Sequence, residues 1–138
     1  MTHHVLADDD LSFVRPLKNV FLIRDPALII RSYAKVRSDF SLDELGFTQQ
    51  WNIYQYCLEH AIEKPIVVDS QQILNNPQAS LKKLCEQLQI PFTSAMLSWP
   101  AGSRESDGVW APYWYGNVEK STGFSQQPTE AVTPADIT

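Results

Sequence analysis

The chain has 138 residues, of which 43% are hydrophobic, and its formal net charge is −5. This length suits one domain or part of one, and this apolar content suits a packed core and excludes a disordered chain. The acidic balance argues against sequence-independent binding to nucleic acid, which depends on summed positive charge, but it leaves room for a local cationic pocket.

The N-terminal ten residues, MTHHVLADDD, have neither the basic region nor the apolar run of a signal peptide. No stretch approaches the roughly 20 apolar residues that a membrane helix needs. We therefore expect a soluble, cytoplasmic chain without membrane contact. Cys57 and Cys85 fall on apolar faces of predicted helices and are expected to be buried, reduced thiols. The adjacent acids Asp8, Asp9 and Asp10 are typical of a solvated loop, so no metal site is predicted.

The first clear element is the apolar run NVFLI at residues 19–23, which predicts a fully buried strand of a parallel sheet. Arg24 ends this run. Asp25 is a good N-cap and Pro26 a good first helical residue, so a helix is predicted to follow over residues 27–36. The stretch therefore reads as strand, tight turn and helix.

The next part of the chain repeats this alternation of strand and helix. Apolar residues at helical spacing predict a helix that ends at Lys64-Pro65, and its apolar face comprises Phe47, Trp51, Tyr54, Leu58 and Ile62. IVVD at residues 66–69 predicts a second buried strand. Asn76-Pro77 opens a further helix, which the stretch from Gln89 to Pro91 closes.

From about Trp99 the chain becomes rich in Ser, Gly, Pro and aromatic residues, which predicts a long ordered loop that packs aromatics onto the domain. Residues 126–138 are expected to form a disordered tail. Strands that alternate with helices predict an α/β domain over residues 1–125. Two strands are fewer than a parallel sheet normally has, so these residues are expected to be the later part of a larger domain. Such an incomplete sheet would favour self-association.

Arg24 is the first candidate functional residue. In open α/β sheets, ligands bind at the carboxyl ends of the strands, where Arg24 is expected to lie beside the N-terminus of the next helix. Ser32 follows eight residues later on that helix. A guanidinium fork and a hydroxyl could together bind phosphate or sulfate. Two alternatives remain open: Arg24 pairs with Asp25, Asp69 or a helix C-terminus, and Ser32 bonds back to a helical carbonyl.

The stretch NVFLIRDPALIIRSYAKV resembles the segment of sulfotransferases that binds the 3′-phosphate of 3′-phosphoadenosine 5′-phosphosulfate (PAPS). In that family, a strand ends in Arg, a turn follows, and a helix carries Ser eight residues after the Arg, followed by Tyr. Arg24, Ser32 and Tyr33 match this pattern. The stretches VVDSQQILNNPQASLKKLCEQLQIPF and GVWAPYWYGNVEKSTGF also resemble family segments, in the same order. The resemblance implies a partial P-loop-NTPase-like fold, a three-layer α/β/α domain with a parallel sheet.

The resemblance also implies roles for residues at both ends of the chain. The family has a histidine about twenty residues before the Arg, which takes the proton of the acceptor hydroxyl. His3 lies 21 residues before Arg24 and is the candidate for this role, with His4 as its substitute. The alternative is that both are simply exposed, as adjacent histidines near a terminus often are. Lys120, in the segment that resembles the family's C-terminal region, is expected to contact the 3′-phosphate.

The family's glycine-rich loop for the 5′-phosphosulfate has no counterpart among the five glycines of the chain. We therefore expect the chain to supply the nucleotide 3′-phosphate site of a sulfotransferase, with a small hydroxyl or amine compound as acceptor, and to be inactive alone. The alternatives are another P-loop-type nucleotide-binding or kinase-like domain, and a non-catalytic α/β interaction module.

Two groups of aromatic residues are open to more than one interpretation. Trp51, Tyr54 and Tyr56 are expected to pack in the core, with a wall of the acceptor pocket as the alternative. The aromatic residues of the C-terminal part are expected to cover the core, with a stacking wall for adenine or acceptor as the alternative; they are Trp99, Trp110, Tyr113, Trp114 and Tyr115.

Overall fold

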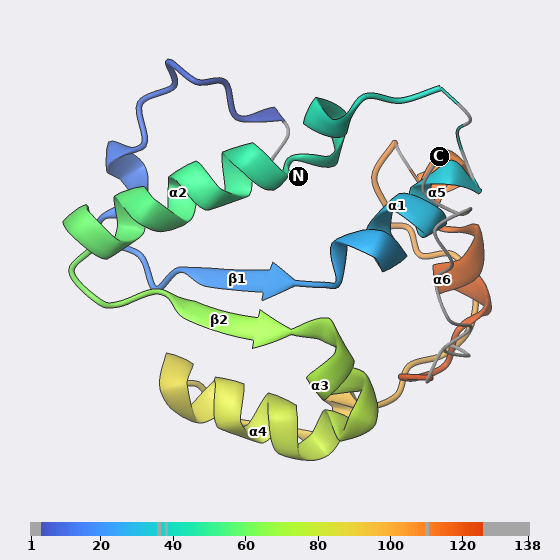
Figure 1. Ribbon diagram of the computed structural model, residues 1–138. Coiled ribbons are helices and arrows are strands. Elements are labelled where there is room, and N and C mark those ends of the chain that lie inside the picture. The colour runs from blue at the N-terminus through green and yellow to red at the C-terminus, as the bar shows by residue number, and fades with distance from the viewer. Residues whose placement is uncertain (1–3, 36, 38, 110, 126–138) are drawn as a thin grey trace. The chain divides into compact units, whose positions relative to one another are not determined.

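The computed structural model describes residues 4–35, 37, 39–109 and 111–125 (Figure 1). Strands and α-helices follow one another in the order β1 (Val20–Ile23), α1 (Pro26–Ala34), α2 (Phe47–His60), β2 (Ile66–Asp69), α3 (Ser70–Asn75), α4 (Pro77–Leu88), α5 (Ala111–Trp114) and α6 (Gly116–Lys120). Short 3₁₀ helices lie at Ser12–Val14, Leu42–Leu45 and Ser94–Met96. The described residues divide into two compact units, residues 4–71 and residues 72–125.

The two strands form a parallel sheet, with Val20 opposite Ile66 and Ile23 opposite Asp69. Both strands run in the same direction, and α2 lies along one side of β1 (Figure 1). The predicted α/β class with a parallel sheet is confirmed. Because parallel strands end at the same edge, the residues that follow them, Arg24 and Ser70, leave the sheet at one edge.

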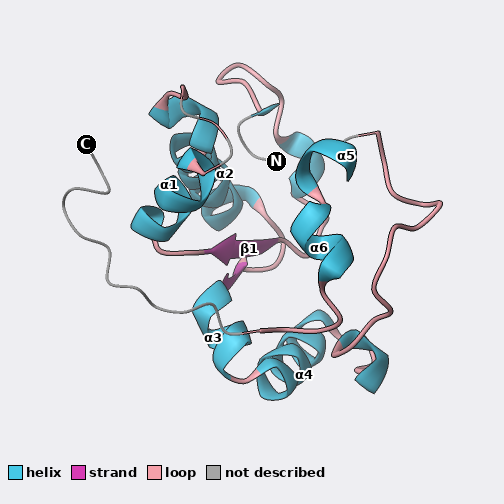
Figure 2. Ribbon diagram, turned by 90° about the vertical axis from the view of Figure 1, so that its right-hand side faces the viewer, coloured by secondary structure: helices cyan, strands magenta, loops and turns pink. Residues whose placement is uncertain are grey.

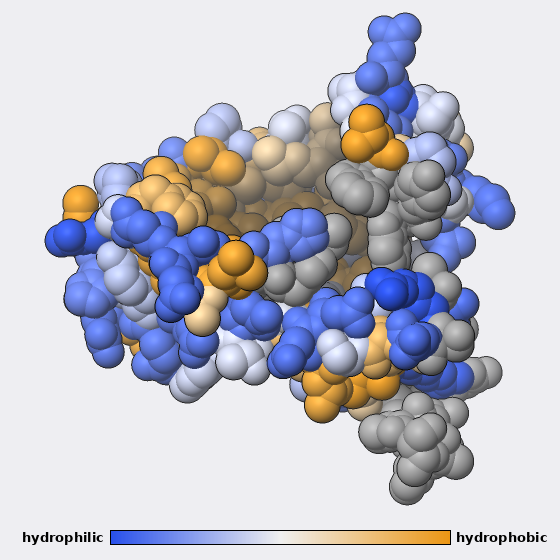
Figure 3. Space-filling view, turned by 90° about the horizontal axis from the view of Figure 1, so that it is seen from above, coloured by the Kyte–Doolittle hydropathy of each residue, from blue (hydrophilic) through white to orange (hydrophobic). Residues whose placement is uncertain are grey.

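The prediction that both strands are fully buried was wrong. Only Phe21 of β1 is buried, whereas Val20, Leu22 and Ile23 are 40, 57 and 42% exposed. Among the described residues the sheet has two strands, too few to shield the side chains on both of its faces. Apolar residues accordingly reach the molecular surface among hydrophilic ones (Figure 3).

The core of the first unit lies between β1, α2 and the 3₁₀ helix at Ser12–Val14. Val14, Phe21 and Cys57 are its buried residues, and the Phe21 ring meets Tyr54 edge to face, with 5.3 Å between the ring centroids. Both cysteines are free and buried, as predicted. Burial raises the pKa of the Cys57 thiol, which keeps it neutral and unreactive.

Helix α2 is shorter than its apolar spacing predicts. It ends at His60, Ala61 is extended, and Ile62 lies outside the helix with 81% of its surface exposed. The Ile62 N–H donates to the Arg15 carbonyl at 3.0 Å, so the backbone leaves the helix to pair with the segment before β1. The helix therefore ends five residues before Pro65, where this tertiary hydrogen bond forms.

Helix α4, in the second unit, has two ends that were predicted. The Asn76 side chain accepts a hydrogen bond from the Ala79 N–H, and Pro77 is the first residue of α4. Gln89 ends the helix in the left-handed region, with φ of 58°.

The C-terminal part was predicted as one long loop, and that prediction was incomplete. Two short consecutive helices, α5 and α6, follow the loop after the 3₁₀ helix at Ser94–Met96 (Figure 2). The predicted disordered tail over residues 126–138 lies outside the described residues. Within the part of the chain that the structure describes, no helix has both the length and the apolarity to cross a bilayer.

Candidate functional site

Arg24 directly follows β1, and α1 begins two residues later at Pro26. The side chain of Asp25 caps this helix, because its Oδ1 accepts a hydrogen bond from the Ala27 N–H at 2.8 Å. The predicted strand, turn and helix are therefore confirmed. The half-buried Arg24 side chain lies at the carboxyl end of the sheet, where ligands of parallel α/β proteins bind.

The Asp25 cap changes what the N-terminus of α1 can bind. Its carboxylate already accepts one of the first-turn N–H groups, and it adds a negative charge where an anion would approach. Binding of an anion beside β1 must therefore depend on the Arg24 guanidinium more than on the helix dipole.

A cavity of about 490 Å³ lies beside Arg24. Its polar wall consists of Arg24, Gln50 from α2 and Ser70, the residue that follows β2. Gln50 is held in place because its Nε2 donates to the Leu22 carbonyl at 3.1 Å. The apolar wall comprises Leu22, Ile23, Pro26, Ile29, Leu45 and Phe47. A guanidinium, an amide and a hydroxyl thus line one cavity at the strand ends, a set that can bind an anionic oxygen.

Ser32 and Tyr33 are not among the residues that line this cavity. Ser32 is exposed on α1. Tyr33 is half-buried, and its ring meets Phe40 edge to face with 5.0 Å between the centroids. The structure thus brings Arg24 together with Gln50 and Ser70, while Ser32 lies two helical turns further along the chain.

The sequence interpretation missed Gln50 and Ser70. A signal for Ser70 was present, because it follows the second predicted strand and the carboxyl ends of parallel strands share one edge. Gln50 had no such signal. It lies one position before Trp51 in an amphipathic helix, where a polar residue normally faces solvent.

The other predicted site residues lie elsewhere in the chain. His3 is outside the described residues, and His4 is exposed. Lys120 is the exposed last residue of α6, in the second compact unit. Their proposed roles therefore depend on the family resemblance.

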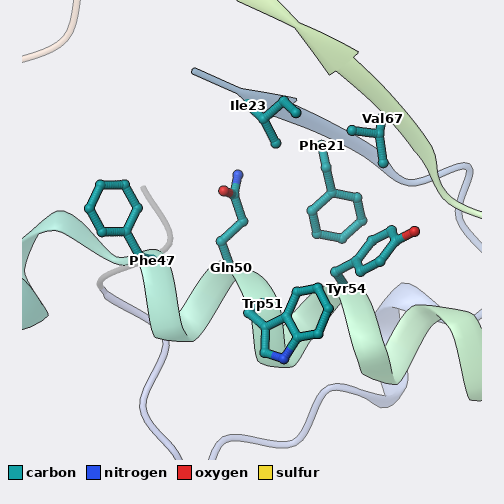
Figure 4. A pocket seen from close by; sticks show the side chains of 7 residues that line it. All are labelled: Phe21, Ile23, Phe47, Gln50, Trp51, Tyr54 and Val67. Atoms are coloured by element: carbon teal, nitrogen blue, oxygen red, sulfur yellow. The ribbon is translucent and has the colours of Figure 1, made fainter. Parts of the chain in front are cut away.

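A second cavity, of about 320 Å³, lies between α2 and one face of the sheet. Phe21, Ile23 and Val67 point from the strands toward α2, which presents Phe47, Gln50, Trp51 and Tyr54 (Figure 4). Among the described residues of this lining, Gln50 is the only amide, and the others are apolar or aromatic. Since Ile23, Phe47 and Gln50 also line the Arg24 cavity, the two cavities adjoin.

The aromatic residues predicted for the core divide between two environments. Tyr54 and Tyr56 pack against the core, as predicted, whereas Trp51 is 59% exposed and lines the cavity between α2 and the sheet. In the C-terminal part, Trp99 meets Phe124 edge to face at 5.4 Å. Trp110 lies outside the described residues.

These features define an α/β domain with a cationic cavity at the carboxyl ends of its parallel strands. The family model for the sulfotransferase domain matches residues 1–137. The chain therefore belongs to the sulfotransferase domain family, whose P-loop-like fold is consistent with the α/β arrangement observed.

Two curated proteins of Arabidopsis thaliana are similar to the chain over 108 residues. Branched-chain-amino-acid aminotransferase-like protein 2 is 40% identical, and branched-chain-amino-acid aminotransferase-like protein 1 is 42% identical. The aligned stretch covers 78% of this chain but 19% of each relative, so the chain spans about a fifth of their length. No solved structure matches the chain.

Proposed function

We propose that the chain supplies the nucleotide 3′-phosphate site of a sulfotransferase that transfers a sulfuryl group from PAPS to a hydroxyl or amine of a small molecule. The observation that carries this proposal is the position of Arg24, at a strand end and beside a cavity, in a chain of the sulfotransferase family. PAPS serves as the sulfuryl donor when bound. Localisation in the cytoplasm is part of the same proposal.

Arg24 would hold the 3′-phosphate, because its planar fork matches two phosphate oxygens. Gln50 and Ser70 line the same cavity and add an amide and a hydroxyl as donors to neutral or anionic oxygens. Ser32, Tyr33 and Lys120 enter the proposal through the family pattern alone.

The proton of the acceptor hydroxyl would pass to an imidazole nitrogen of His3 or His4. Histidine suits this role because its ordinary pKa lies near neutral pH, so it can accept the proton at the pH of the cell. Sulfuryl transfer otherwise depends on positioning the groups and on stabilising charge on the equatorial oxygens. None of the residues assigned to the site has the role of stabilising charge on the equatorial oxygens.

The names of the two relatives do not transfer to this chain. They describe aminotransferase-like proteins, but the aligned stretch is 19% of each relative, and the sulfotransferase model matches nearly the whole of this chain. We therefore base the proposal on the domain family and make no claim of transamination.

The test is a thermal-shift titration with 3′-phosphoadenosine 5′-phosphate, with ADP as the control that lacks the 3′-phosphate. We expect the first nucleotide to raise the melting temperature and ADP to leave it unchanged, since only a ligand that binds the folded state stabilises it. Arg24→Ala should weaken binding about tenfold or more, because a charge-assisted bidentate contact is lost.

Arg15→Ala is the matched control, since it removes the same charge from an exposed residue before β1. Equal shifts with both nucleotides would favour another P-loop-type or kinase-like domain. The absence of any shift would favour a non-catalytic α/β module. Retention of binding in Arg24→Ala would show that the site lies elsewhere.

A further inference from the structure

The second compact unit contains a cavity that the proposed sulfotransferase site does not use. Its volume is about 380 Å³, and it lies between the loop that starts at Trp99 and helix α6. Trp99 and Tyr115 provide aromatic side chains to its lining, and Arg104, Asp107 and Glu119 provide charged ones. Every one of these residues belongs to residues 72–125, so the cavity is complete within one unit.

The aromatic wall is fixed by contacts of its own. The indole Nε1–H of Trp99 donates to Ser121 Oγ at 3.0 Å, and the Trp99 ring meets Phe124 edge to face. The Trp99 backbone is held as well, because its N–H donates to the Thr122 carbonyl at 3.0 Å. Trp99 is therefore a preformed wall, and a ligand need not order it.

The charged part of the wall is also tied to α6. The Gly102 N–H donates to the Glu119 carbonyl at 2.7 Å, which holds the loop against the helix. Asp107 Oδ2 accepts the Arg104 N–H at 2.9 Å, so this carboxylate closes a short turn of the loop. Both carboxylates, those of Asp107 and Glu119, are attached to backbone that is hydrogen-bonded in place.

Glu119 differs from Asp107 in what its side chain contacts. The Glu119 residue is half-buried, and no hydrogen bond or ion pair joins its carboxylate to any side chain that the structure describes in residues 72–125. A bound cation would give this half-buried carboxylate a partner of opposite charge. Asp107 and Glu119 together outnumber the single guanidinium of Arg104, which is exposed.

We propose that this cavity binds a small organic ammonium ion, a primary amine that carries an aromatic or apolar group. The ammonium would lie at the Glu119 and Asp107 carboxylates, and the apolar group would contact Trp99 and Tyr115. Tryptophan and tyrosine faces attract cations through the ring quadrupole, which adds to the attraction of the carboxylates. The site does not depend on the proposed nucleotide site, because the described residues that line it are all different from those that line the Arg24 cavity.

The experiment titrates the ¹⁵N-labelled chain with benzylamine and with benzyl alcohol, which has the same ring without the charge. Binding is followed at the indole N–H resonance of Trp99, which is assigned by its loss in Trp99→Phe. We expect benzylamine to shift this resonance in a saturable way and to bind about five- to tenfold more tightly than benzyl alcohol.

Glu119→Gln should reduce the affinity for benzylamine by about five- to tenfold and leave that for benzyl alcohol unchanged. Glu86→Gln is the matched control, because Glu86 is an exposed glutamate on α4 outside the cavity. Equal affinities for the amine and the alcohol would overturn the proposal, and so would an unchanged affinity for benzylamine in Glu119→Gln.

If Glu119→Gln does not fold, the salt dependence of the wild-type chain decides the question. Raising the ionic strength from about 0.02 to about 0.3 M should weaken benzylamine binding and leave benzyl alcohol binding unchanged, because salt screens a partly exposed ion pair. Salt-independent binding of benzylamine would overturn the proposal.

Discussion

At the scale of single residues, Arg24 and Asp25 set opposite charges side by side at the end of β1. The Asp25 carboxylate stabilises α1 by accepting the Ala27 N–H. The same carboxylate opposes any anion that binds at Arg24. Helix stability and anion affinity therefore make conflicting demands on this one side chain, and two substitutions can separate them.

We predict that Asp25→Asn raises the affinity for 3′-phosphoadenosine 5′-phosphate by about two- to fivefold, since it removes the repulsion between two like charges at a partly exposed site, worth about 0.5–1 kcal/mol. Asparagine is as good an N-cap as aspartate, so the free energy of unfolding should hardly change. Asp25→Ala should instead lose about 1 kcal/mol of stability. Calorimetric titration and urea unfolding give the two quantities.

Asp43→Asn serves as the control, because Asp43 is exposed on the 3₁₀ helix at Leu42–Leu45 and does not line the Arg24 cavity. A fall in nucleotide affinity in Asp25→Asn would contradict the prediction. It would mean that the carboxylate contributes to the site, for example by orienting Arg24.

At the scale of elements, the end of α4 depends on an unusual backbone conformation. Gln89 has φ of 58°, the only positive φ among the described residues other than glycine. Its N–H donates to the Glu86 carbonyl at 3.1 Å, and the Ile90 N–H donates to the Cys85 carbonyl at 3.0 Å. These bonds pair the last helical carbonyls, while the Gln89 side chain imposes a steric cost that glycine would avoid.

Gln89→Gly is therefore predicted to increase the free energy of unfolding by about 0.4–1 kcal/mol. The same change at Gln87, which is exposed and still within α4, should decrease it by about 0.5–1 kcal/mol. Urea unfolding followed by far-ultraviolet circular dichroism measures both. Destabilisation by both substitutions would show that the left-handed conformation at residue 89 carries no strain.

At the scale of the whole molecule, the sheet leaves one edge of β1 without a partner strand among the described residues. The Asn19 carbonyl pairs with Ile66, so the alternate residues Val20 and Leu22 direct their backbone groups to the opposite edge. At that edge, the Gln50 side chain donates a hydrogen bond to the Leu22 carbonyl. An exposed apolar edge of this kind is where a further strand can add.

Self-association through this edge remains a prediction. We expect sedimentation velocity at about 0.1 mM to detect dimers or larger species, and Leu22→Lys to shift the chain toward the monomer, because a charge on an edge strand opposes pairing. Leu42→Lys is the matched control, since Leu42 is also an exposed leucine of the same unit. A monomeric wild-type chain would contradict the prediction, as would equal association of both variants.

Much of the fold followed from local chemistry. Asp25 with Pro26, and Asn76 with Pro77, predicted two helix starts, because a cap and its proline act within a few residues. The limits of α2 and the burial of β1 were mispredicted for a common reason. The hydrogen bond of the Ile62 N–H goes to Arg15, which is distant in sequence. The exposure of Leu22 depends on how many strands and helices pack around β1, which no local pattern specifies.

The order of strands, caps and motifs along the chain was enough to predict the α/β class, the resemblance to sulfotransferases and the place of Arg24 at the end of a strand. These features depend on periodicity, capping and motif order, which are local properties of the chain. The folded chain was needed to show that Gln50 and Ser70 line the cavity with Arg24, and that Glu119 and Trp99 line another. Those neighbours come from separate elements, and the pairing of strands and the packing of helices bring them together.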